Sequence, residues 1–154
     1  MPQRHGQFGT YHVITNTENK KKWCTLEGVP KVLIDTLCLV RSIQNAQLYA
    51  FCILPTHMHI ILCPGKKGLS SFMQSFKTNS SKNVKNILSA SSLFSGWRDG
   101  FFDEHIQTGK QLGAAISYVQ RNAAKHRIVT NMMEWPWTSI NFPTLLDPIE
   151  MWLD

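Results

Sequence analysis

The sequence lacks several features that would define whole classes of protein. None of its apolar runs approaches the ~20 residues that a membrane-spanning helix needs. Its first ten residues, MPQRHGQFGT, contain no apolar segment of the kind that directs secretion, so we expect a cytoplasmic protein with no membrane partner. None of its four cysteines forms a C-x-x-C pair, which argues against a zinc knuckle or a thioredoxin-like motif. Cys38, Cys52 and Cys63 lie in apolar stretches and are expected to be buried free thiols.

Acidic residues are missing from the middle of the chain. The net charge is +6, and the segment from residue 66 to residue 98 has six basic residues and no acid: Lys66, Lys67, Lys77, Lys82, Lys85 and Arg98. A basic stretch of this kind suggests a polyanionic partner, most often a nucleic acid. A solvated helix face explains the same charges equally well, so charge alone leaves both interpretations open.

The 154 residues suit one domain with one core, and we see neither a linker nor a repeat. We therefore expect a single domain over residues 1–154, with its core at about 9–140. Alternating or β-branched segments predict strands at residues 9–17, 47–54 and 57–63, and a fourth strand with flanking turns within residues 96–106. Apolar residues at helical spacing predict helices at residues 26–45, 69–88 and 108–129. This order predicts an α+β, ferredoxin-like split βαβ fold, with a four-stranded antiparallel sheet, helices on one face and a further C-terminal helix.

Two histidines lie in the third predicted strand, CILPTHMHIILCP. Side chains alternate across a strand, so His57 and His59 point to the same face, roughly 7 Å apart, while Met58 points to the core. Two imidazoles on one face can bind one metal ion. The H-x-H spacing is a weak signal by itself, because neighbouring surface histidines or one satisfied core histidine would give the same string.

A third ligand and a nucleophile can be sought on the last predicted helix. Tyr118 and Asn122 are four residues apart and would share a helix face. In the structural interpretation they are a half-buried aromatic residue and a solvated or capping side chain. In the functional one, the Asn122 oxygen completes a metal site and Tyr118 attacks an ester that the metal polarises. A phenol with a pKa near 10 needs a nearby positive charge, for which Arg121, Lys125 and the ion are candidates.

Six segments appear in an order typical of one family. They are YHVITNT, AFCILPTHMHIIL, LSSFMQSFKTNSSKNV, WRDGFFDEHI, YVQRNAAKHRIV and WPWTSI. From about Tyr11 to Ile140 the chain resembles the single-tyrosine HUH transposases, in particular those associated with repetitive extragenic palindromes (REP). The family's fold is the ferredoxin-like fold predicted above.

The resemblance implies a role for each site residue. His57 and His59 would bind a divalent metal, Asn122 would be its side-chain ligand, and Tyr118 would be the nucleophile. The implied reaction cleaves and rejoins single-stranded DNA near hairpins through a 5′-phosphotyrosine. Two imidazoles and an amide oxygen favour Mg²⁺ or Mn²⁺, with zinc left open. The family includes monomers and dimers with shared active sites, so a homodimer is also open.

The chain departs from the family at two places. Thr56 stands where the family commonly has Asn, and NAAKHRIV replaces NPVRAGLV after the tyrosine, which puts hairpin specificity in doubt. The residues predicted to contact DNA are Gln74, Lys77, Lys82, Lys85, Arg98, Arg121 and Lys125. A catalytically idle or domesticated DNA-binding module is the alternative function. His12 and His105 receive no role, and Trp97, Trp135 and Trp137 could stack on bases or pack in the interior.

Overall fold

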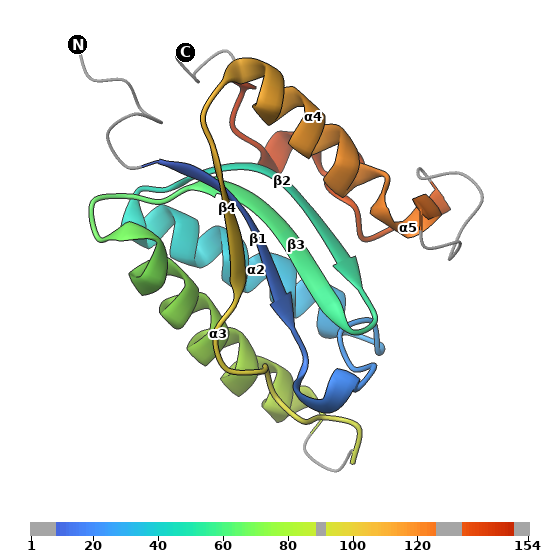
Figure 1. Ribbon diagram of the computed structural model, residues 1–154. Helices are drawn as coiled ribbons and strands as arrows, with labels where there is room; N and C mark the ends of the chain where they lie inside the picture. Colours follow the sequence, from blue (N-terminus) through green and yellow to red (C-terminus); the bar gives the residue numbers. More distant parts are fainter. Residues whose placement is uncertain (1–8, 89–91, 126–133, 150–154) are drawn as a thin grey trace.

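The predicted four-stranded antiparallel sheet is present. A computed structural model describes residues 9–88, 92–125 and 134–149 (Figure 1). The strands are β1 (Thr10–Asn16), β2 (Gln47–Leu54), β3 (His57–Cys63) and β4 (Phe102–Ile106), in the sheet order β2-β3-β1-β4. Every paired neighbour is antiparallel. This order and direction confirm the ferredoxin-like α+β plan.

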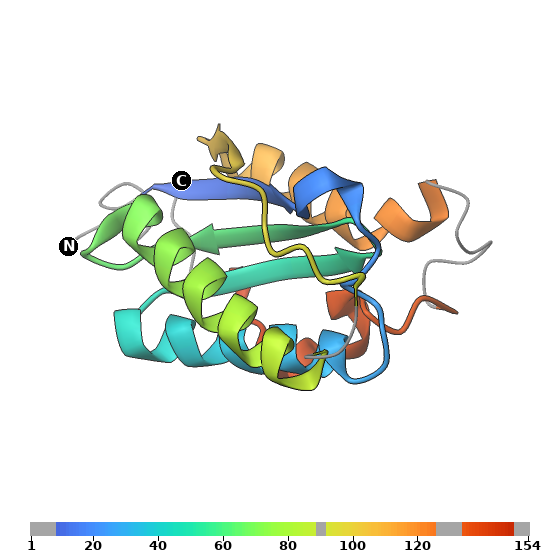
Figure 2. The same ribbon diagram turned by 90° about the horizontal axis from the view of Figure 1, so that it is seen from below.

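Helices cover both faces of the sheet. The helices α2 (Val29–Gln44) and α3 (Gly68–Ile87) pack side by side on one face, and α4 (Gly109–Gln120) lies on the other (Figure 2). The short helix α5 (Asn122–Lys125) follows α4, and single turns occur at η1 (Glu18–Lys20), η3 (Ser139–Asn141) and η4 (Pro143–Leu145). None of the helices in the described part of the chain is long and apolar enough to cross a membrane.

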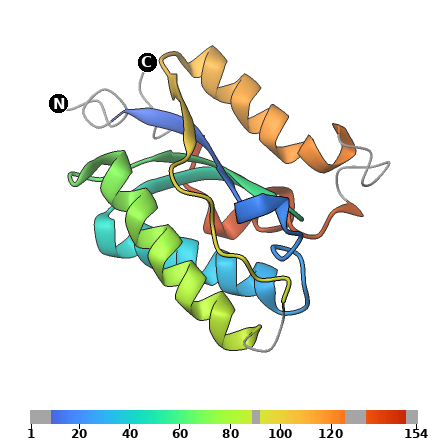
Figure 3. The same cartoon turned by 60° about the horizontal axis from the view of Figure 1, so that its bottom comes forward.

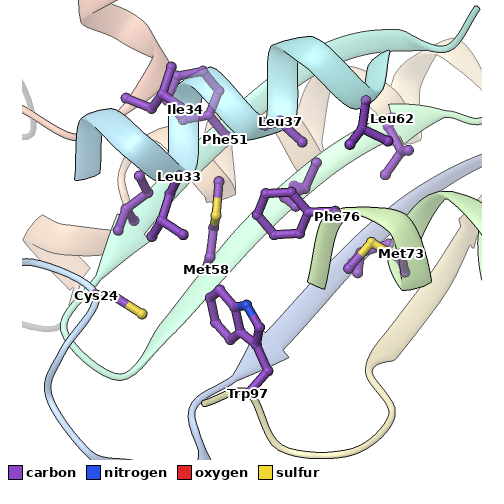
Figure 4. Close-up of a cluster of buried hydrophobic side chains, with 14 of the residues drawn as sticks. Cys24, Leu33, Ile34, Leu37, Phe51, Met58, Leu62, Met73, Phe76 and Trp97 are labelled. Carbon is purple, nitrogen blue, oxygen red and sulfur yellow. The ribbon is translucent and has the colours of Figure 1, made fainter. Parts of the chain in front are cut away.

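The core lies between the sheet and the helix pair α2 and α3. Strand β3 pairs with β1 so that Ile60 lies opposite Val13 and Met58 opposite Thr15, and all four are buried. Figure 4 shows Met58 and Leu62 meeting Phe76 from α3 and Leu33 and Leu37 from α2. The alternation of β3 therefore directs Met58, Ile60 and Leu62 into this core, as its pattern predicts.

Two helix boundaries differ from the prediction. Helix α2 begins at Val29 rather than at residue 26, because Gly28 has a left-handed φ of 83° that interrupts a right-handed helix. The last helix is not continuous over residues 108–129, since α4 ends at Gln120 and a turn at Arg121 separates it from α5. Residues 126–129 of the predicted helix lie outside the described residues.

A C-terminal segment covers the edge of β2, as the third view of the ribbon indicates (Figure 3). The Ile53 amide donates to the Trp137 carbonyl at 2.9 Å, and the indole N–H of Trp135 donates to the Ile53 carbonyl at 2.7 Å. Farther along, Asp147 accepts from the Leu48 amide at 2.8 Å and donates its own amide to the Leu48 carbonyl at 2.8 Å. These bonds satisfy backbone groups that an edge strand would otherwise expose.

Two glycine substitutions test how closely the elements approach. At Gly65, an added Cβ would overlap the backbone oxygen of Gln44 at the end of α2, so Gly65→Ala should lower the free energy of unfolding by about 1–3 kcal/mol. At Gly113, inside α4, a Cβ meets nothing within 4 Å, so Gly113→Ala should raise it by about 0.5–1 kcal/mol. Urea denaturation measures both free energies of unfolding. A Gly65→Ala protein as stable as wild type would contradict the close approach of Gly65 to the Gln44 backbone.

Candidate active site

Strand pairing gathers three histidines on the sheet face that α4 covers. In the register of β1 and β3, His59 lies opposite Ile14 and Ile61 opposite His12, so His12 and His59 are diagonal neighbours on one face. His57 shares that face at the start of β3. The sequence left His12 without a role, and the register between the two strands, which a single sequence does not display, is what brings it to His59.

The three imidazoles contact one another. The ring centroids of His57 and His59 are 5.1 Å apart, and those of His12 and His59 are 5.2 Å apart in a stacked arrangement. His12 Nε2 lies 2.9 Å from His59 Nδ1, which is hydrogen-bonding distance. His57 Nδ1 lies 3.0 Å from the hydroxyl oxygen of Thr56 in the preceding turn. In both predicted ligands, therefore, Nδ1 has a polar neighbour.

Tyr118 lies over this cluster. Its ring centroid is 5.9 Å from that of His12 and 6.0 Å from that of His59, with edge-on geometry in both pairs. The side chain is 36 % exposed, so a substrate can reach it. The capping box at the N-terminus of α4, where Thr108 and Gln111 bond reciprocally, fixes the start of the helix that carries it. The structure thus brings the predicted nucleophile to the predicted histidine pair.

Asn122 lies in a different helix from the one predicted. Because the helix is interrupted at Arg121, Asn122 begins α5, whereas Tyr118 lies in α4. It is fully buried, and neither its amide nitrogen nor its amide oxygen has a hydrogen-bond partner among the described residues. Such a group costs about 1–3 kcal/mol unless something satisfies it.

Strand β2 links Asn122 to the histidines. The thiol of Cys52 has hydrogen bonds to the backbone of Ala123 and to the Thr138 side chain, and burial raises its pKa to about 12. Across the sheet, Cys52 is the direct partner of His59. The residue after Asn122 therefore contacts the strand position beside His59.

These donors fit a divalent metal. Two imidazoles and an unsatisfied buried amide oxygen form a partial ligand set that leaves positions for phosphate oxygens. Over residues 9–88, 92–125 and 134–149, no group of three or more His, Cys, Asp or Glu side chains could hold a metal ion. A site here would therefore depend on the amide of Asn122.

A cleft of about 890 Å³ opens between β4, β1 and α4. Tyr118 and His12 line it together with Phe102, which is 63 % exposed, and Glu104, the direct partner of His12 across the two strands. Burial lowers the pKa of His12, and the Glu104 carboxylate opposes that shift. The lowered pKa favours the neutral form of the His12 imidazole.

The predicted DNA-binding residues fall into separate places. Gln74, Lys82 and Lys85 are exposed on α3, in the helix layer on the opposite side of the sheet from the histidines. Arg121 is exposed at the end of α4, on the histidine side. The side chain of Lys125 lies outside the described residues.

Arg98 and Lys77 meet at the turn before β4. The Arg98 amide donates to the carbonyl of Asn16, the strand partner of His57, at 2.8 Å. The Lys77 ammonium donates to the carbonyls of Arg98 at 2.7 Å and Gly100 at 2.6 Å. Burial lowers the Lys77 pKa, opposed by Asp99. Lys77 therefore holds this turn in place, which the charge pattern alone could not reveal.

The aromatic candidates for base stacking are used for packing. Trp97 is buried against Trp23 and donates its indole N–H to Ser80 at 2.9 Å, and Trp135 and Trp137 belong to the segment that covers β2. His105, the other histidine without an assigned role, lies opposite Tyr11 on β1 and shares that residue's side of the sheet, away from His12.

Comparisons with known proteins found similar transposases. A curated relative, the REP-associated tyrosine transposase of Escherichia coli strain K12, is 24% identical over 135 residues, covering 86% of this chain and 77% of the relative. The solved structure of a REP-associated tyrosine transposase bound to a REP hairpin has a TM-score of 0.72 at 23% identity, covering 95% of this chain and 86% of that one. A candidate transposase from Deinococcus radiodurans, solved at 16% identity, has a TM-score of 0.55 and covers 73% of this chain and 88% of that one.

The family model is the decisive comparison. The model described as "Transposase IS200 like" matches residues 8–122, a span that includes all four strands, the histidine pair and Tyr118. That span is more than half of the chain. The structural likeness independently supports the same fold. The protein therefore belongs to the IS200-like transposase family.

Proposed function

We propose that this protein is a metal-dependent endonuclease and strand transferase for single-stranded DNA, with Tyr118 as its nucleophile. The observation that carries the proposal is the position of Tyr118 beside the His57 and His59 pair. The centroid of its ring is 6.0 Å from that of His59. A transposase must break and rejoin DNA, and a covalent enzyme intermediate conserves the energy of the broken phosphodiester.

The proposed step is a transesterification. The Tyr118 oxygen attacks a phosphorus atom of the DNA backbone, an O–P bond to tyrosine forms, and the bond from phosphorus to the 3′ oxygen breaks. The phenol proton passes to solvent, and the leaving oxygen takes up a proton to become a free 3′-hydroxyl. A later attack by a 3′-hydroxyl on the phosphotyrosine reverses the step and joins a new pair of ends.

His57, His59 and Asn122 are the residues that would hold Mg²⁺ or Mn²⁺. The bound ion would neutralise charge on the phosphoryl oxygens and orient the scissile bond. The chain's own contribution is to fix the donors: the strand fixes the two imidazoles, and burial of Asn122 keeps its amide oxygen away from water. Tyr118 contributes an exposed phenol that a substrate can reach, and the bound ion and Arg121 are the positive charges that would activate it.

A DNA hairpin is the proposed partner, and the chain of contacts from α3 to His57 suggests its path. Ser80 on α3 bonds to Trp97, Arg98 follows, and the Arg98 amide bonds to Asn16, opposite His57. The C-terminal half of α3, with Lys82 and Lys85, therefore lies at the same end of the sheet as His57 (Figure 1). A hairpin stem held there would present its single-stranded flank to the histidine face. The relative solved with a REP hairpin supports a ligand of this kind.

The covalent intermediate provides the first test. Labelled single-stranded DNA containing short family hairpins, incubated with Mn²⁺ and the protein, should give a labelled protein band that survives denaturation. Tyr118→Phe should abolish that band, because no oxygen remains to attack, while DNA affinity should stay within about twofold since only a hydroxyl is lost. His57→Ala should reduce the band by roughly tenfold or more through loss of a metal ligand.

The other tyrosines serve as matched controls. The chain has three, and Tyr11→Phe and Tyr49→Phe should retain the band. Tyr11 contacts His105, and Tyr49 bonds through its hydroxyl to Gln47. If wild type retarded the hairpin on a native gel but formed no covalent band, the protein would be a DNA-binding module without cleavage activity, which would contradict the proposal.

Two lysines of α3 should behave differently. Lys82→Ala removes an exposed charge, so it should weaken hairpin binding and reduce the slope of log affinity against log salt by about 1, with a change in stability under ~0.5 kcal/mol. Lys77→Ala removes two hydrogen bonds to the turn before β4, so it should lower the free energy of unfolding by about 1–2 kcal/mol. Salt titrations measure the effect on binding and urea denaturation the effect on stability. If both variants changed binding and stability equally, the separate roles of Lys82 in DNA binding and Lys77 in holding the turn would be refuted.

A further inference from the structure

The geometry points to His12 as a positioning residue that holds the His59 ring in the tautomer whose Nε2 lone pair could bind a metal ion. This inference rests on the proposed function, because it concerns how one of the proposed ligands is prepared. It assigns a task to a residue for which neither the sequence pattern nor the family match supplies one.

The first support is the contact itself. A neutral imidazole has one N–H donor and one lone-pair acceptor, so the 2.9 Å contact between His12 Nε2 and His59 Nδ1 requires one ring to donate and the other to accept. If His59 donates from Nδ1, its Nε2 carries the lone pair that a metal needs. If His12 donates instead, His59 Nε2 carries a proton and cannot bind a metal.

The second support is the matching arrangement at His57. Its Nδ1 is 3.0 Å from the Thr56 hydroxyl, which can accept from an Nδ1–H in the same way. Both rings of the pair are thus held from their Nδ1 side, one by a hydroxyl and one by an imidazole. Metal-binding histidines generally donate their second N–H to such a neighbour, which fixes both the tautomer and the ring orientation.

The third support is the position of His12, which strand pairing and two ring contacts define. His12 lies in the middle of β1, paired on one side with Ile61 and on the other with Glu104, so its backbone is fixed by two neighbouring strands. Its ring stacks on His59 at 5.2 Å and meets Tyr118 at 5.9 Å. A residue held in this way can orient His59 without itself touching the metal.

The test reads the tautomer directly in the metal-free protein. Long-range ¹⁵N–¹H spectra of ¹⁵N-histidine-labelled protein should show the His59 proton on Nδ1, with signals assigned through single substitutions among the six histidines. In His12→Phe, which keeps a stacking ring but offers no acceptor, the His59 signals should shift toward the Nε2–H form. In His12→Gln, whose amide oxygen can accept, the wild-type form should largely return.

A second readout is the affinity for Mn²⁺ without DNA, followed by the electron paramagnetic resonance of the free ion. His12→Phe should raise the Mn²⁺ dissociation constant by roughly 10–100-fold, and His12→Gln should recover much of that loss. His105→Phe is the matched control, because the His105 ring contacts Tyr11, and it should change neither the His59 signals nor the affinity.

The outcomes separate this inference from the proposed function. Wild-type protein with the His59 proton on Nε2, or a His12→Phe protein with wild-type tautomer and Mn²⁺ affinity, would overturn the role of His12. Protein that shows the expected tautomer and its dependence on His12, but binds no Mn²⁺, would support the hydrogen bond and contradict the metal-dependent reaction.

Discussion

The antiparallel pairing of β1 with β3 is the constraint on which the rest of the structure depends. Its register sets Val13 against Ile60, which sends one row of side chains into the core under α2 and α3. The same register sets Ile14 against His59, which sends the alternate row to the opposite face and brings His12 within hydrogen-bonding distance. A slip of one residue would exchange the two faces and place imidazoles in the core.

As a result, one face of the sheet forms the hydrophobic core and the other carries the candidate reactive residues. The face under α2 and α3 is a continuous apolar layer and contributes most of the burial. On the other face, Ile61, Cys52 and Leu54 pack under α4 and α5 toward β2. Toward β1 and β4 that face carries His12, Glu104 and the exposed ring of Phe102. The reactive residues thus lie where α4 crosses from packed surface to open cleft.

The sequence predicts the fold and much of the site, because both depend on local patterns. Strands β2 and β3 begin and end where alternation predicts, and the H-x-H segment faces away from the core as expected. What the sequence does not reveal depends on contacts between distant segments. The break at Arg121 accompanies burial of Asn122 and Ala123 against β2, His12 reaches His59 through strand register, and Lys77 is used by a turn more than twenty residues away.

The cover over β2 has a consequence for how the chain is made. The bonds from β2 to Trp135 and Asp147 join residues 82 and 99 positions apart in the sequence. At translation rates of roughly 5–20 residues per second, β2 leaves the ribosome several seconds before the segment that satisfies its outer edge. During that interval the outer edge of β2 has unpaired backbone groups, which other nascent chains on the same messenger RNA can contact. Slowing synthesis of residues 135–147 would lengthen the exposure, so codon choice in that part of the gene bears on the yield of folded protein.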